Sequence, residues 1–165
     1  MTDHLVHATC VAFVPEDGSV GTGWERPFGV LLRGPSGAGK SDLALRSIDR
    51  GWRLVADDQT ELRSVEGRLS AASPGVIAGR MEVRGLGIVT VPSAPGAELC
   101  LVVDLVAPGL VERLPEPDVC ELLGVRLQCL ALDPFEASAL AKLRLAAFRE
   151  ARAIMEAIRP GGKGG

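Results

Sequence analysis

Tyrosine is absent from this 165-residue chain, and only four phenylalanines and two tryptophans supply aromatic rings. Aliphatic side chains must therefore fill the core, and a hydrophobic fraction of 47% is enough for a substantial one. Excess positive charge is also lacking. The net charge of −3 excludes a basic surface for nucleic acid or an anionic membrane. The apolar runs are too short to span a bilayer.

No C-x-x-C pair occurs among the four cysteines, which are Cys10, Cys100, Cys120 and Cys129. Three of them lie in apolar stretches, which predicts buried free thiols in a reducing cytoplasm. The polar N-terminus, with His4 and His7, is unlike a signal peptide. The length predicts a single domain over residues 1–159, and residues 160–165 are expected to form a flexible glycine-rich tail.

What the chain does have is one strong motif, G-x-x-x-x-G-K-[ST], matched at every fixed position. Its residues are Gly34, Pro35, Ser36, Gly37, Ala38, Gly39, Lys40 and Ser41. A first strand is predicted over 5–13 and a loop over 14–27. An apolar run over 30–32 then precedes the motif and predicts a buried strand. A helical pattern follows, with Leu43, Ala44 and Ile48 on one side. This strand–loop–helix context is the one that a phosphate-binding P-loop requires.

The motif's chemistry suits the phosphates of ATP with Mg²⁺. Its glycines leave room for phosphate oxygens, and the loop N–H groups point at them from the positive end of a helix. Lys40 supplies a positive charge for the outer phosphates. Ser41 offers a hydroxyl ligand to Mg²⁺, which keeps water and phosphate oxygens as its other ligands.

Two adjacent carboxylates, Asp57 and Asp58, directly follow an apolar strand predicted over 52–56. In open α/β sheets the ligand lies beyond the carboxyl ends of the strands, so these acids are expected near the phosphates. One of them would hold a metal or take the proton of an attacking hydroxyl. The alternative is a turn or helix-capping aspartate, which is a common role for this residue.

A hairpin is predicted over 60–72, turning at Glu66-Gly67, and a connector over 74–79 leads to a strand from residue 81. Glu82 and Arg84 would share one face of that strand. They form either a solvated ion pair or a metal ligand beside a phosphate-binding guanidinium. The glycines that flank them favour the second interpretation, because they allow close approach of the backbone.

An apolar strand over 99–104 ends in Asp104, which in a generic P-loop nucleotidase would be the Walker-B acid. Asp104 therefore competes with Asp57 and Asp58 for the magnesium. A last strand is predicted over 125–130. The final helix is expected to open at Asp133 as N-cap, with Pro134 in the first helical position.

Several segments together resemble the catalytic domain of bacterial HPr kinase/phosphorylase. They are the P-loop with the helix start after it, Leu54 to Asp58, Pro74 to Gly79, and the Glu-Val-Arg-Gly-Leu-Gly-Ile segment over 82–88. The resemblance covers about residues 5 to 91, and the chain looks like a short, one-domain form. It implies an α/β P-loop fold related to phosphoenolpyruvate carboxykinase, with a mixed sheet and a C-terminal helix.

The resemblance also implies a reaction and site roles. The reaction is ATP-dependent phosphorylation of a serine on HPr, the phosphocarrier, with reversal by inorganic phosphate; many family members are hexamers. Asp57 corresponds to the base and Asp58 to its neighbour at the metal site, with Ser41 and Glu82 as magnesium ligands. Arg84 corresponds to a phosphate-site arginine. By itself, a lone histidine in an apolar strand is interpreted as a structural residue. The resemblance instead matches His7 to a histidine near the catalytic aspartate.

The chain departs from the family in one segment. Longer members carry Pro-Gly-Arg-Asn before the last helix, with a catalytic arginine, whereas residues 133–138 here contain none. Two other functions stay open beside the serine kinase. One is a P-loop nucleotidase or small-molecule kinase that uses Asp104, and the other is a nucleotide-sensing module without transfer.

Overall fold

The computed structural model describes residues 4–15, 27–75 and 79–158. In chain order its elements are β1 (His4–Val6), β2 (Ala8–Phe13), β3 (Phe28–Arg33), α1 (Lys40–Asp49), β4 (Arg53–Ala56), β5 (Thr60–Val65), β6 (Arg68–Ala72), β7 (Arg80–Val83), β8 (Gly87–Thr90), β9 (Ala97–Leu105), the short 3₁₀ helix η2 (Pro108–Leu110), β10 (Asp118–Leu122), β11 (Val125–Leu132) and α2 (Ala139–Ile158).

A mixed sheet organises these elements around β9, which pairs in parallel with both β3 and β11 and meets β6 antiparallel at its start. On the far side of β3, β2 runs antiparallel between β3 and β4. The strands β3, β4, β9 and β11 therefore all point the same way. Residues that follow them meet at one edge of the sheet, where ligands of α/β proteins bind. The predicted α/β fold with a mixed sheet and a C-terminal helix is confirmed.

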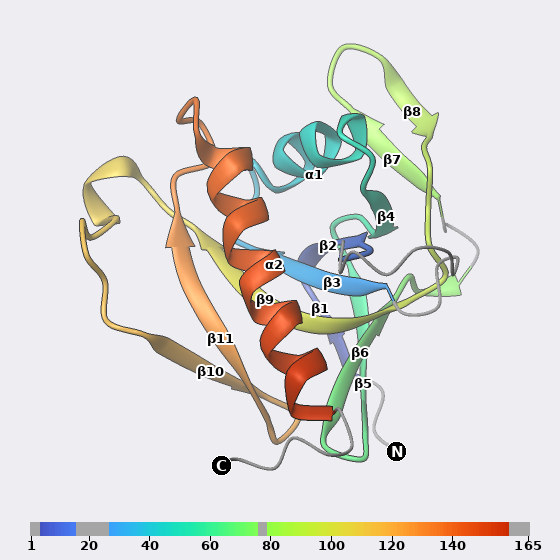
Figure 1. The fold of residues 1–165 in the computed structure, drawn as a ribbon. Coiled ribbons are helices and arrows are strands. Elements are labelled where there is room, and N and C mark those ends of the chain that lie inside the picture. The colour runs from blue at the N-terminus through green and yellow to red at the C-terminus, as the bar shows by residue number, and fades with distance from the viewer. Residues whose placement is uncertain (1–3, 16–26, 76–78, 159–165) are drawn as a thin grey trace, which may run out of the picture.

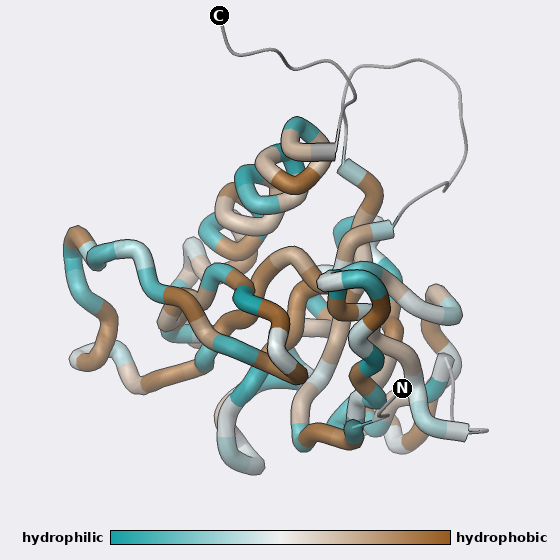
Figure 2. The backbone as a smooth tube through the Cα atoms, turned by 90° about the horizontal axis from the view of Figure 1, so that it is seen from below, coloured by the Kyte–Doolittle hydropathy of each residue, from teal (hydrophilic) through white to brown (hydrophobic). Residues whose placement is uncertain are grey.

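The sheet separates two hydrophobic clusters, because successive side chains of a strand point to opposite faces. On one face, Val30 and Leu101 pack with Leu43 of α1 and Leu143 of α2. On the other, Leu31 and Val102 pack with residues of the β5–β6 and β10–β11 hairpins. Figure 1 shows α2 lying across the sheet, and Figure 2 shows hydrophobic and hydrophilic residues alternating along it, as expected of a helix with one buried side.

Two turns follow the predicted chemistry. The hairpin β5–β6 turns at Glu66 and Gly67, whose φ angles of 53° and 76° are those of a two-residue turn with both central residues left-handed. Gly51, at φ 98°, ends α1 by donating its N–H to the carbonyl of Ile48 at 3.0 Å.

The predicted start of the final helix is wrong. The helix begins at Ala139, and the side chain of Asp133 instead accepts the backbone N–H of Phe135 at 3.0 Å, as in an Asx-turn. The carbonyl of Pro134 accepts a hydrogen bond from Arg46 of α1. The capping residues are thus used to dock a turn against α1, and this tertiary contact overrides the local helix signal.

Two further strand predictions need correction, and one strand was missed. The first strand is interrupted at His7, and β7 ends at Val83, so Glu82 and Arg84 do not share a strand face. β10 was not predicted. It pairs with β11 through a turn at Leu123 and Gly124, with φ angles of 49° and 77°. A leucine rarely takes positive φ, so this turn carried no recognisable sequence signal.

All four cysteines are free, but only Cys10 and Cys100 are buried. Burial raises the pKa of both buried thiols. Residues 76–78 of the predicted connector, most of the loop predicted over 14–27, and the tail over 160–165 lie outside the described residues. In the part of the chain that is described, neither α1 nor α2 is long and apolar enough to cross a membrane.

Candidate active site

The P-loop connects β3 to α1 at the carboxyl edge of the sheet. Gly39, at φ 102°, is the N-cap residue of α1. Because glycine has no side chain, no side-chain hydrogen bond caps this end of the helix. Such uncapped first-turn N–H groups bind anions. A Cβ on Gly39 would lie 3.0 Å from Pro134 and 3.1 Å from the ring of Phe135. Both backbone angle and space therefore require glycine here.

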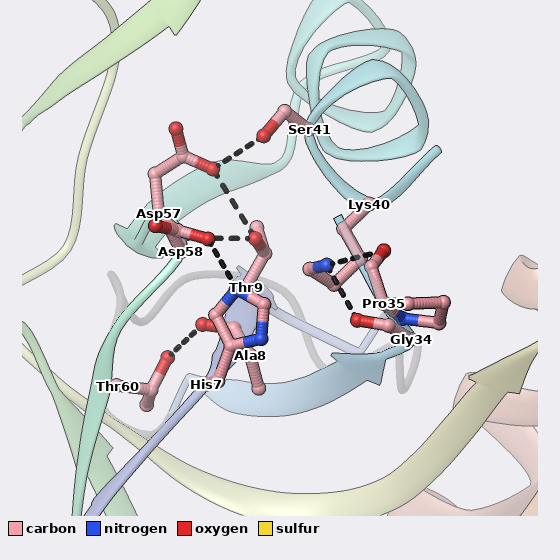
Figure 3. Close-up of polar contacts among 10 residues, drawn as sticks. All are labelled: His7, Ala8, Thr9, Gly34, Pro35, Lys40, Ser41, Asp57, Asp58 and Thr60. Carbon is pink, nitrogen blue, oxygen red and sulfur yellow. Dashed lines mark hydrogen bonds and ion pairs between the residues drawn. The ribbon is translucent and has the colours of Figure 1, made fainter. Parts of the chain in front are cut away.

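The side chain of Lys40 lies inside the P-loop and bonds to its backbone. The side chain is 6% exposed, and the ammonium donates to the carbonyl of Gly34 at 2.6 Å and to that of Pro35 at 3.0 Å (Figure 3). These contacts satisfy a buried charge, which would otherwise be costly. The charge is thereby held within the loop, directly before Ser41.

Asp57 reaches this loop from β4. Its Oδ1 accepts a hydrogen bond from the hydroxyl of Ser41 at 2.7 Å and another from the hydroxyl of Thr9 at 3.2 Å (Figure 3). Within the described residues no hydrogen bond reaches Oδ2. The strand order explains the meeting, because β4 and β3 flank β2 and end at the same edge.

Asp58 turns sharply away from Asp57. It has φ 65°, and the N–H of Gln59 donates to the carbonyl of Asp57 at 2.7 Å, as in a γ-turn with positive φ, which is rare and strained. The backbone N–H of Asp58 donates to the hydroxyl of Thr9 at 3.1 Å. Its carboxylate lies 2.7 Å from Nε2 of His7, and this pair is exposed to solvent.

The structure therefore brings together four residues that the sequence singled out, His7, Ser41, Asp57 and Asp58, and adds Thr9. Thr9 was not among the residues that the sequence singled out. Its one signal is a hydroxyl in an otherwise apolar strand, two residues after His7, and buried threonines of that kind are common in strands.

Glu82 and Arg84 are not brought into this group. Glu82 alternates on β7 with buried Met81, so its side chain is exposed, and Arg84 is exposed in the turn that follows. Among the described residues no hydrogen bond or ion pair joins either side chain to the P-loop. Met81 belongs to the same hydrophobic cluster as Leu43, so the β7–β8 hairpin packs beside α1 (Figure 1).

Asp104 has different partners. Its two oxygens accept hydrogen bonds from Arg33 at 2.8 and 3.0 Å, and Oδ2 also accepts one from the thiol of Cys129 at 3.2 Å. Burial by itself would raise the pKa of Asp104, but the bonds from Arg33 and Cys129 outweigh it and lower that pKa. Burial, together with the Asp104 carboxylate, raises the pKa of Cys129 to about 12.

A family model described as the HPr serine kinase C-terminal domain matches residues 26–107, which contain the P-loop, the two adjacent aspartates and Asp104. This chain belongs to the HPr serine kinase C-terminal domain family. A curated HPr kinase/phosphorylase of Clostridium tetani is 48% identical over 89 residues, and one of Clostridium novyi is 47% identical over 69 residues.

These alignments cover 54% and 42% of this HPr-kinase-type chain, but only 28% and 22% of the two relatives. The fold likeness extends further. A solved structure described as the Hpr(Ser) kinase/phosphatase from Coxiella burnetii matches with a TM-score of 0.70 and 27% identity, over 93% of this chain and 99% of that one. The family fold therefore continues through β10, β11 and α2.

Proposed function

We propose that this domain transfers the γ-phosphate of ATP to a serine of the phosphocarrier HPr. The observation that carries the proposal is the 2.7 Å hydrogen bond between Ser41 and Asp57. It sets a carboxylate beside the first helical turn after the P-loop, where phosphoryl transfer needs an acid–base group close to the outer phosphate. Family membership supplies the protein substrate, since the relatives are named for HPr.

Asp57 is the proposed base. Its Oδ1 is held by two hydroxyls, and Oδ2 takes no hydrogen bond from the described residues, so Oδ2 is the oxygen suited to accept the proton of the serine hydroxyl. In the reverse direction the same oxygen would return the proton. Asp58 is the proposed neighbour at the metal site, and its carboxylate lies 2.7 Å from Nε2 of His7.

The residues present suit Mg²⁺. Ser41 and Asp57 offer hard oxygen atoms, which this ion prefers, and no cluster of three acidic, histidine or cysteine ligands exists among the described residues. Mg²⁺ in such sites keeps waters and phosphate oxygens, so one or two protein ligands suffice. We propose Ser41 as one ligand and, from the resemblance alone, Glu82 as another. When bound, the ion neutralises phosphate charge.

The phosphates of ATP are the proposed ligand of residues 34–41. In this binding mode Lys40 exchanges its contacts with the Gly34 and Pro35 carbonyls for the outer phosphates, and the loop N–H groups hold the inner ones. Arg84, exposed on the hairpin beside α1, is proposed as a further phosphate contact.

Reversal by inorganic phosphate is a separate proposal. The segment over 133–138 places Phe135, 70% exposed, beside Gly39 and contains no arginine. We therefore expect forward transfer to outpace phosphorolysis. Pyrophosphate release from phospho-HPr at a rate matching the forward reaction would contradict this.

By resemblance we also propose one kinase domain over 1–159, a homo-oligomer such as a hexamer, and a cytoplasmic location.

The alternative that uses Asp104 as a Walker-B acid is less well supported. Both oxygens of Asp104 accept from Arg33, whereas Asp57 contacts the P-loop serine directly. The nucleotide-sensing alternative differs from the kinase only in lacking phosphoryl transfer. An assay of phosphoryl transfer to HPr therefore distinguishes the two.

The test is incubation of the purified protein with γ-labelled ATP, Mg²⁺ and HPr. The expected result is label on one HPr serine, and HPr with that serine replaced by alanine is the control. Tight ATP binding without label on HPr would overturn the kinase proposal in favour of a sensor. Label released as phosphate at the same rate with and without HPr would favour the nucleotidase.

A further inference from the structure

Thr9 uses its one hydroxyl on both members of the aspartate pair. The residue is fully buried in β2, and its hydroxyl donates to Oδ1 of Asp57 at 3.2 Å while accepting the backbone N–H of Asp58 at 3.1 Å (Figure 3). A hydroxyl carries one donor and two acceptor sites, so these bonds fit its capacity. The bond that Thr9 donates occupies Oδ1 of Asp57, while Oδ2 accepts no hydrogen bond from the part of the chain that the structure describes.

The hydrogen bond from the Asp58 N–H to the Thr9 hydroxyl restrains a strained backbone conformation at Asp58. Asp58 is a non-glycine residue at φ 65°, a conformation that persists only where surrounding contacts enforce it. The side chain of Asp58 is 66% exposed, and its partner His7 is 50% exposed, so that ion pair is a weak restraint. The buried hydroxyl of Thr9 is the more rigid anchor, because it belongs to the central sheet.

We propose that Thr9 is the positioning residue of this active site. It holds the Asp57–Asp58 turn so that Oδ2 of Asp57 faces the acceptor serine, and it acts through Asp57 without touching either substrate. The inference rests on the proposed kinase function. The bond from Thr9 matters most when Ser41 binds a metal ion. Of the two described residues that donate to Oδ1 of Asp57, only Thr9 then remains.

The test is the pair Thr9→Val and Thr9→Ser. Valine keeps the size and removes the hydroxyl, whereas serine keeps the hydroxyl. With HPr and Mg-ATP we expect valine to lower kcat at least tenfold, roughly what a displaced catalytic group costs, with the KM for ATP unchanged within about twofold. Serine is expected to restore kcat to within about threefold of wild type.

Thr60→Val is the matched control. Thr60 is also fully buried in the same corner, but its hydroxyl donates to the carbonyl of Ala8 at 2.9 Å and touches neither aspartate. Its kcat should stay within about threefold of wild type, because the base keeps its position. Circular dichroism checks folding, and Thr9→Ala replaces the valine variant if valine does not fold.

The outcomes separate the two proposals. An active wild type whose Thr9→Val variant keeps its kcat, or loses it no more than Thr60→Val does, overturns the positioning role alone. A rise in KM at constant kcat also overturns it, because Thr9 would then act on binding. A wild type that labels no HPr overturns the kinase proposal, and the role of Thr9 with it.

Discussion

Asp57 and Asp104 are both carboxylates at the ends of buried strands, but their partners give them different chemistry. Asp104 accepts a forked pair of hydrogen bonds from Arg33, which stabilises its charged form. Asp57 accepts two hydroxyl donors on Oδ1, whereas none of the described residues donates to its Oδ2. A proton acceptor needs an open oxygen near the reacting group, so the surroundings favour Asp57 as the base.

Asp57→Asn should abolish most transfer while leaving ATP bound. The amide cannot take the serine proton, so kcat for HPr phosphorylation is expected to fall by about 10²–10⁴. The Kd for Mg-ATP, measured by calorimetry, should change little. Asp104→Asn is the control and is expected to lower kcat by less than about tenfold. The opposite ranking of the two variants would favour a nucleotidase that uses Asp104.

Lys40→Ala should weaken ATP binding. A buried ammonium that bonds a charged phosphate contributes roughly 1.5–3 kcal/mol, so the Kd is expected to rise by about ten- to a hundredfold. Lys142→Ala removes another of the three lysines, an exposed one paired with Glu136, and should leave the Kd unchanged. Equal affinities of wild type and Lys40→Ala in a calorimetric titration would contradict the phosphate site.

At the scale of elements, the Arg33–Asp104 pair joins two parallel strands at their carboxyl ends. Arg33 is the last residue of β3 and precedes Gly34, and Asp104 is its partner in the register with β9. The pair therefore fixes the point from which the P-loop leaves the sheet. Because each side chain is about one-third exposed, solvent screens the pair and its net stabilisation is small.

The stabilisation by Asp104 should depend on pH. Its folded-state pKa is lowered, so the contribution is fully present above the ordinary value of 3.8 and is lost as pH falls through the folded pKa. Urea unfolding at pH 7 should show Asp104→Asn less stable by about 1 kcal/mol, and the difference should shrink below about pH 4.

Asp42→Asn is a suitable control for this experiment. It removes an exposed ion pair with Arg46 within α1, 3.0 Å long, and should cost less than about 0.5 kcal/mol. If the difference in free energy of unfolding between wild type and Asp104→Asn grew as the pH fell, the lowered pKa assigned to Asp104 would be contradicted.

At the scale of the molecule, four of the five aromatic residues that the structure describes meet in one place despite their distance in the sequence. Phe13 stacks on Trp52 with ring centroids 4.7 Å apart and meets Phe148 of α2 edge-on at 5.2 Å. Such pairs add to the energy of burial. They attach α2 to the face of the sheet that also carries α1.

Phe13→Ala should therefore destabilise the whole fold. The side chain is 1% exposed, and truncation of a buried phenylalanine costs about 3–5 kcal/mol. Leu145→Ala on the outer face of α2, at 74% exposure, should change stability by less than about 0.5 kcal/mol. Equal midpoints for the two variants in thermal unfolding would show that α2 is not docked through Phe13.

Local features of the structure could be read from the sequence because their determinants are adjacent residues. Turn residues predicted the hairpin at Glu66 and Gly67, and the P-loop motif predicted the strand, loop and α1. The missed features depend on distant contacts. The β10–β11 turn uses a leucine at positive φ, and the start of α2 is displaced because Pro134 docks on Arg46.

The sequence by itself determined the strand, glycine-rich loop and helix of the P-loop motif, since glycine spacing and a following helix create that structure locally. Only the tertiary structure decided which carboxylate lies beside it. Asp57 meets Ser41 because β4 and β3 both flank β2, and strand neighbours are chosen by burial on both faces of the sheet. The same non-local pairing brought Thr9 to both aspartates, which no spacing along the chain encodes.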